Sequence, residues 1–215
     1  YFPTSPDLGT PVAKASDAAV TWIVDNLGWL TEGLNTAVTV GVLNPLESLL
    51  TQSPWFVTTA ALAAIAWLLG GLRASVVALV LLLAIAGTGL WQDTMVTFTQ
   101  TIVATLLTMA VGIVLGVWIG RNQRADTLLR PFLDAGQVLP AFVYLIPMLG
   151  LFGPTRFTAI ATGIVYSIPI VVKIVGQGIR DVPVSMVEAA TSAGTTTWQL
   201  ITKVQLPAEI GRAHV

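Results

Sequence analysis

Two consecutive apolar segments, residues 54–72 and 74–91, contain no charged side chain and are separated only by Arg73. An α-helix rises about 1.5 Å per residue, so each segment is just long enough to cross a bilayer, which takes about 20 residues. Composition agrees, because 54% of the chain is hydrophobic and 10% is charged, against about 25% charged residues in soluble domains. The chain is therefore predicted to be an all-α integral membrane protein that begins with a transmembrane hairpin at residues 54–93.

A third and longer span is predicted at residues 94–120. Inside it Gly112, Gly116 and Gly120 recur every four residues and so share one face of the helix. Glycines spaced in this way let a second membrane helix approach closely. They are expected to form a packing seam and not a substrate contact.

The fourth predicted segment, residues 130–152, is interrupted by Pro140 and Pro147. Proline frees backbone carbonyls that need partners or water, so this segment is expected to be kinked and to face protein or a cavity. The fifth span, residues 155–179, contains Lys173, which lies about two turns before Arg180. The default interpretation is that this lysine reaches the interface. The alternative is a translocation path with these residues: Phe142, Tyr144, Pro147, Pro169 and Lys173.

The region before the hairpin has a different character. Residues 1–17 are rich in Pro, Thr, Ser and Gly and are typical of a tail. Residues 18–50 carry apolar side chains at helical spacing, interrupted by acids, and contain Trp22 and Trp29. One or two interfacial amphipathic helices, with the tryptophans at headgroup depth, are predicted. Two helices packed on the rest of the protein are an equally good interpretation.

The charges predict an orientation. If the spans alternate, one side of the membrane receives six of the ten basic residues, at positions 73, 121, 124, 130, 180 and 203. The segment up to Asp93 on the other side carries six acids and only Lys14. By the positive-inside rule the first side is cytoplasmic. The N-terminus, with residues 1–53, is therefore expected to be extracytoplasmic.

A short polar stretch after the fifth span carries dense local signals. Ser185 and Glu188 have the spacing of a capping box at a helix start, and Thr196 and Gln199 offer a second one. Gly194 between them can supply the left-handed residue that ends a helix. The stretch is therefore predicted to form a helix, a glycine elbow and a second helix on the cytoplasmic side.

This stretch also resembles the EAA loop of ABC importer permeases. The matching residues are Glu188-Ala189-Ala190, Gly194 and Leu206-Pro207, with Val204 where isoleucine is usual. The resemblance implies that residues 185–194, which begin at Ser185, form the coupling helix that docks on a cytoplasmic ATPase, within a loop at residues 182–207.

Further segments resemble the permeases of glycine betaine/proline importers, the osmoprotectant ABC family. They lie at residues 84–91, 116–121, 130–135 and, most tellingly, 140–147. The resemblance implies a type I ABC importer (MetI-like) permease core at residues 94–209, in a bacterial or archaeal cytoplasmic membrane. It also implies three partners: a second permease copy, an ATPase subunit that binds the ATP, and an extracytoplasmic solute-binding protein. Which solute is carried stays open, because the binding protein usually sets selectivity in such importers.

Other functions fit less well. The net charge of −1 gives no basic field for nucleic acid, and without cysteine there are no disulfides or thiolate sites. The spans lack the paired acids or histidines of a membrane enzyme, so no catalytic residue, metal or cofactor is predicted. A permease for another small solute is the alternative, and a passive channel is a weaker one.

The last six residues, 210–215, follow Leu206-Pro207 abruptly and include the sole histidine, His214. The codons ATC GGA AGA GCA CAC GTC encode them and match the start of a sequencing-library adapter. We expect a C-terminally truncated permease, with the core incomplete and residues 210–215 derived from the adapter.

Overall fold

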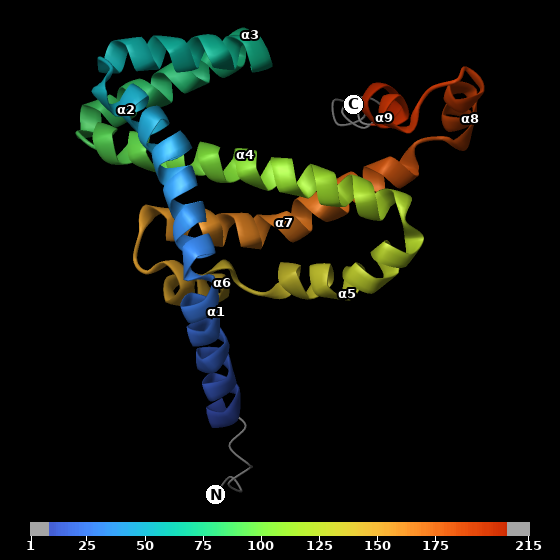
Figure 1. Ribbon diagram of the computed structural model, residues 1–215. Coiled ribbons are helices and arrows are strands. Elements are labelled where there is room, and N and C mark those ends of the chain that lie inside the picture. Colours follow the sequence, from blue (N-terminus) through green and yellow to red (C-terminus); the bar gives the residue numbers. More distant parts are fainter. Residues whose placement is uncertain (1–8, 206–215) are drawn as a thin grey trace, which may run out of the picture. The chain divides into compact units, whose positions relative to one another are not determined.

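The computed structural model describes residues 9–205, and every regular element in this range is a helix (Figure 1). The chain divides into two compact units. Unit 1 contains residues 1–103 and 145–161, and unit 2 contains residues 104–144 and 162–215. Leu206, Pro207 and residues 210–215 lie outside the described residues, so the predictions made for them stay predictions.

Three described helices are long and apolar enough to cross a membrane: α3 (Trp55–Thr88), α4 (Trp91–Arg121) and α7 (Arg156–Asp181). The pair α5 (Gln123–Val138) and α6 (Ala141–Phe152) would add a fourth if it is one broken span. The prediction of a helical membrane protein is therefore confirmed, with three or four candidate spans by this measure.

Unit 1 begins with α1 (Gly9–Val38), which a π-helical turn at Thr39–Leu43 joins to α2 (Asn44–Gln52). The prediction of a tail over residues 1–17 was wrong for residues 9–17, which are helical. Pro11 does not prevent this, because the first N–H groups of a helix have no intrahelical acceptor and proline is tolerated there. Ala13 and Ala15, which follow, favour the helix.

The long helix α3 is broken at Gly71, whose φ of +73° and ψ of −172° are not helical. Beyond the break, the Ser75 hydroxyl donates a hydrogen bond of 2.9 Å to the carbonyl of Ala63. These residues would lie about 18 Å apart along a straight helix. The two halves of α3 therefore fold back on each other (Figure 1), and the prediction that each half crosses the membrane stays a prediction. The turn between them uses a conformation that glycine adopts most readily.

In unit 1 the first residue of α7 is tied to α2. Arg156 donates to the Glu47 carboxylate at 2.6 Å and to the Asn44 side chain at 3.1 Å. In the same unit the rings of Phe152 and Phe157 pack edge to face, with their centroids 4.9 Å apart.

The segment predicted as one kinked helix at residues 130–152 is instead two helices, and the prediction missed the first turns of α5. Asn122 caps α5 by accepting from the backbone N–H groups of Arg124 and Ala125 at 3.1 and 3.2 Å. The chain turns by 101° between α5 and α6. Leu139 has an extended backbone with ψ of 133°, because the residue before a proline disfavours the helical region. Pro147 lies inside α6 without ending it.

Candidate functional site

The short helix α8 (Val184–Ser192) follows α7 directly. Its N-cap residue is Pro183, whose carbonyl accepts from the N–H groups of Met186 and Val187 at 3.0 and 3.3 Å. The predicted capping box at Ser185 and Glu188 was therefore wrong, because the N-cap lies two residues earlier, at Pro183, and Ser185 lies in the first turn of the helix. Proline at this position already holds the extended backbone from which a helix can start, with ψ of 133°.

The glycine elbow after α8 is confirmed. Gly194 has φ of +78°, in the left-handed region. Its N–H donates to the carbonyl of Thr191 at 2.9 Å, and the N–H of Thr195 donates to the carbonyl of Ala190 at 3.2 Å. This pair of bonds is the Schellman motif, which satisfies carbonyls that the end of a helix would otherwise leave open.

The second predicted capping box is also confirmed. The N–H of Thr196 donates to the Gln199 side chain at 2.9 Å, and the N–H of Gln199 donates to the Thr196 hydroxyl at 3.3 Å. This reciprocal pair starts α9 (Thr197–Leu200), which continues as a π-helical turn at Ile201–Gln205. The order helix, glycine, helix is therefore held at both ends of the elbow by local hydrogen bonds.

The side chains of α8 are available at the surface of unit 2. All nine of its residues are described, and none of them is buried. Val184 is 70% exposed and Met186 45% exposed, and Glu188 and Ala189 are exposed as well. Trp198 of α9 is 72% exposed. A polar and apolar surface of this kind, held on a fixed backbone, suits docking to another protein.

In unit 2, α4 and α7 lie side by side along the predicted glycine face (Figure 1). A Cβ added at any of these glycines would meet a Cβ of α7 at less than 3 Å, so that a neighbouring group would have to shift. The three pairs are Gly112 with Val171 at 2.8 Å, Gly116 with Val175 at 2.6 Å, and Gly120 with Ile179 at 2.8 Å. On the other helix, a Cβ at Gly176 would meet Ile119 at 3.0 Å.

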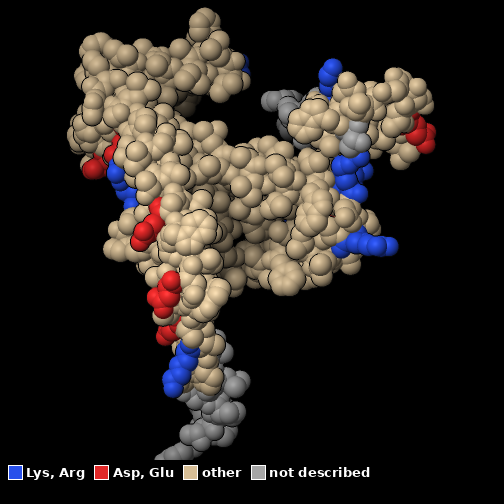
Figure 2. All heavy atoms as spheres, viewed as in Figure 1, with Lys and Arg blue, Asp and Glu red and all other residues tan. Residues whose placement is uncertain are grey.

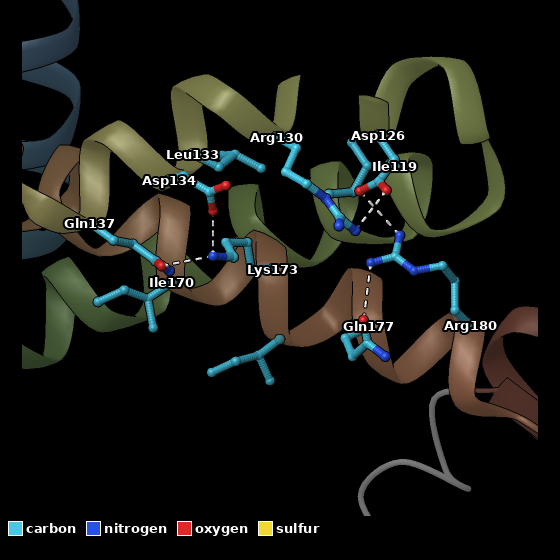
Figure 3. A pocket seen from close by; sticks show the side chains of 11 residues that line it. Ile119, Asp126, Arg130, Leu133, Asp134, Gln137, Ile170, Lys173, Gln177 and Arg180 are labelled. Carbon is cyan, nitrogen blue, oxygen red and sulfur yellow. Dashed lines mark hydrogen bonds and ion pairs between the residues drawn. The ribbon is translucent and has the colours of Figure 1, made fainter. Parts of the chain in front are cut away.

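A cavity of about 610 Å³ in unit 2 is lined mainly by α5 and α7 and holds two groups of charged side chains (Figure 3). In one group Lys173 donates to the Asp134 carboxylate at 2.6 Å and to the Gln137 side chain at 2.9 Å. In the other, Asp126 lies between Arg130 and Arg180, at 3.0 and 3.2 Å. Elsewhere, on the face drawn in Figure 2, charged side chains form small groups on an otherwise uncharged surface.

The residues predicted for a translocation path separate into different places. Tyr144 donates to the carbonyl of Gly136 at 2.7 Å, and a Cβ added at Gly136 would lie 3.0 Å from Pro169. Phe142 is 69% exposed. Lys173 is the member of the set that lines the cavity. Pro147 belongs to unit 1.

Sequence reasoning missed most of the charged cavity. The polar lining residues that it did not predict for a functional site are Asp126, Arg130, Asp134, Gln137, Gln177 and Arg180. A signal was present, because positions 126, 130, 134 and 137 fall on one face of a helix, as do 170, 173, 177 and 180. Among the described residues no group of three or more acids or histidines could hold a metal ion.

Comparison with known proteins identifies related sequences. Residues 112–211 match a family described as the binding-protein-dependent transport system inner membrane component. The chain is 36% identical over 188 residues to the glycine betaine/proline betaine transport system permease protein ProW of Escherichia coli K12, covering 87% of the chain and 53% of that protein. It is 28% identical over 197 residues to the glycine betaine permease protein OpuAB of Bacillus subtilis, covering 92% and 70%.

A third relative is the glycine betaine/carnitine transport permease protein GbuB of Listeria monocytogenes, 37% identical over 117 residues. This match covers 54% of the chain and 42% of the relative. The chain thus spans about half the length of several of the relatives that it matches, including 53% of the Escherichia coli protein. The family match includes α7, α8 and the elbow at Gly194.

Proposed function

We propose that this chain belongs to the family of binding-protein-dependent transport system inner membrane components, which its residues 112–211 match, and that it is the permease subunit of an ATP-driven importer. The proposed cargo is a compatible solute such as glycine betaine, proline or choline. Three relatives are named for glycine betaine, and these matches cover between 54% and 92% of the chain. The subunit itself would be non-catalytic, with ATP bound and hydrolysed by a partner.

The observation that carries this proposal is the exposed helix α8 with its fixed ends. To move the permease, an ATPase subunit needs an exposed element whose backbone keeps its conformation when the ATPase pulls or pushes on it. Pro183 sets the start of α8 and the Schellman bonds at Gly194 set its end. Ala189 and Ala190 are small, so a partner groove can approach the backbone closely. We assign the coupling role to Ser185, Glu188, Ala189, Ala190 and Gly194, and by resemblance to Leu206 and Pro207.

We further propose five spans and a fixed orientation. The two halves of α3 would cross separately because the chain reverses at Gly71. With α4, the bent pair α5–α6 and α7, five crossings result. An odd number leaves residues 1–53 outside and the loop at residues 182–207 in the cytoplasm, where an ATPase would be. The excess of Lys and Arg on the loop side supports this orientation.

The end of the cavity that holds Lys173 and Asp134, apart from the group around Asp126, supports a place for the solute path (Figure 3). Charged side chains within membrane helices almost always face the bundle interior or a water-filled cavity. Lys173 lines this cavity, and Tyr144 and Pro169 pack around Gly136 of the same unit. We propose that these three residues, together with Phe142, border the path within unit 2. A second permease copy would face it, and an extracytoplasmic binding protein would deliver the solute.

Co-purification tests the proposal. The permease, produced together with a candidate ABC ATPase subunit from the same organism, should retain the ATPase on an affinity column. Glu188→Lys should release most of the ATPase without changing thermal unfolding, since Glu188 is exposed. Glu32→Lys is the matched control, because Glu32 is also exposed and falls on the predicted opposite side. Equal retention by both variants would count against a docking role for α8.

A further inference from the structure

The Asp126 carboxylate joins two helices that lie far apart in the sequence. One oxygen, Oδ2, accepts from Nη2 of Arg130 at 3.0 Å on the same helix. The other, Oδ1, lies 3.2 Å from Nη1 of Arg180, in the last turn of α7. Figure 3 shows the carboxylate between the two guanidinium groups. Of these two contacts, only the one to Arg180 connects α5 with α7.

The surroundings favour this ion pair. The Asp126 side chain is 7% exposed, so its charge has little water and needs positive partners. Asp126 lies in the first turn of α5 and Arg180 in the last turn of α7. An acid at a helix N-terminus and a base at a C-terminus are each stabilised by the helix dipole. Both helix ends therefore favour the charged forms of the two side chains that make this contact.

The contact lies at the base of α8. Ile179 and Val182, on either side of Arg180, are each 6% exposed. Ile179 also packs against Gly120 at the end of the seam between α4 and α7. Two residues after Val182 the chain enters α8, which has no buried residue. The last anchored point before the exposed helix is thus held by apolar packing on α4 and by charge on α5.

We propose that Asp126 is a positioning residue that makes α5 follow the coupling helix α8 during the transport cycle. A force on α8 reaches α7 through the peptide chain and α4 through the glycine seam. It reaches α5, which lines the cavity together with α7, through Asp126 and Arg180. The inference rests on the proposed function, because it assumes that an ATPase acts on α8.

Charge carries this link. Nη1 of Arg180 is buried and lies within ion-pair distance of Oδ1, yet it makes no aligned hydrogen bond among the described residues. A lysine at position 180 should therefore preserve part of the link, whereas a glutamine should not. Arg130 offers a matched control, because it contacts the same carboxylate from within α5 and its side chain is 55% exposed.

The experiment uses the complete permease with its ATPase and binding protein in proteoliposomes and measures solute uptake per ATP hydrolysed. Asp126→Asn and Arg180→Gln should each lower this ratio by about fivefold or more, the lower end of typical coupling between sites. The double variant should lower the ratio no further than the poorer single variant does, because both substitutions remove the same contact between Asp126 and Arg180. Arg180→Lys should recover part of the ratio, and Arg130→Gln should leave it within about twofold of the unsubstituted protein.

A purely structural role would lower thermal stability and leave the ratio of the folded protein unchanged, and that result would overturn the proposal. An equal loss in Arg130→Gln and Arg180→Gln would also overturn it. If Asp126→Asn fails to fold, Arg180→Lys and Arg180→Gln are compared instead. Equal ratios of uptake to ATP hydrolysis in these two variants would overturn the proposal. Failure of the unsubstituted protein to bind any ATPase would instead contradict the proposed function.

Discussion

Two glycine-containing regions of unit 2 use the same residue for opposite reasons. Along the seam between α4 and α7, Gly116 is helical, and a Cβ there would lie 2.6 Å from the Cβ of Val175. At the elbow after α8, a Cβ on Gly194 would meet nothing within 4 Å, but the residue has φ of +78°. The seam therefore requires glycine for its size, and the elbow requires it for its backbone.

The difference determines what each region can tolerate. A larger side chain in the seam must separate two membrane helices whose contact gives unit 2 much of its core, around Ile119 and Val172. A larger side chain at the elbow has space but strains the turn. A larger side chain in the seam should therefore destabilise the fold of unit 2. A larger side chain at the elbow should instead change the direction in which the chain leaves α8.

The largest effect is expected from Gly116→Val. The new side chain would meet Val175 and also the backbone oxygen of Val172, which lies 3.1 Å from the added Cβ and cannot rotate away. Overpacking of this kind costs about 1–3 kcal/mol, and contact with backbone places this site at the upper end. Thermal unfolding in detergent should show the loss, with Gly116→Ala in between. An unchanged midpoint would mean that α4 and α7 do not pack as described.

A smaller and different effect is expected from Gly194→Val. A β-branched residue at positive φ costs about 1–2 kcal/mol locally. The protein should still fold, while ATP hydrolysis should become uncoupled from uptake in membrane vesicles. Gly194→Asn is the control, because asparagine tolerates the left-handed region, and it should transport normally.

Asparagine placed at Gly116 as well as at Gly194 tests whether the two glycines are required for different reasons. Gly116→Asn should unfold at lower temperature than the unsubstituted protein, because asparagine is too large for the seam whatever its backbone preference. If asparagine were tolerated at both positions or at neither, the seam and the elbow would not differ in requiring small size at Gly116 and a left-handed backbone at Gly194.

Much of this contrast could be predicted from sequence, because both regions depend on local patterns. A four-residue glycine repeat marks one helix face, and a glycine between two polar clusters marks an elbow. The start of α8 was predicted wrongly because Ser185 and Glu188 have the spacing of a box, although Pro183 had already fixed the helix start. Two local signals for a helix start lay close together there, and Pro183, not the Ser185–Glu188 pair, became the N-cap of α8.

The charged cavity could not be predicted in the same way. Asp126 and Arg180 come together only because α5 and α7 pack, and no local rule states which helix faces which. Asp134 and Lys173 are separated by 39 residues, so their ion pair could not be predicted from the sequence either. The spacing of polar residues on each helix could have indicated a polar face, but pairing the two faces required the three-dimensional structure.

The smallest effect should come from Thr196→Ala, which tests whether Gly194 fixes the elbow alone. Loss of a helix N-cap costs about 0.5–2 kcal/mol, and the low end is expected here because α9 is short and Thr196 is exposed. Hydrogen exchange of the Gln199 N–H should speed up, since its acceptor is removed. Exchange at the Gly194 N–H should not change if the Schellman bonds hold independently. Faster exchange at both would show that the elbow and the cap after it form one cooperative unit.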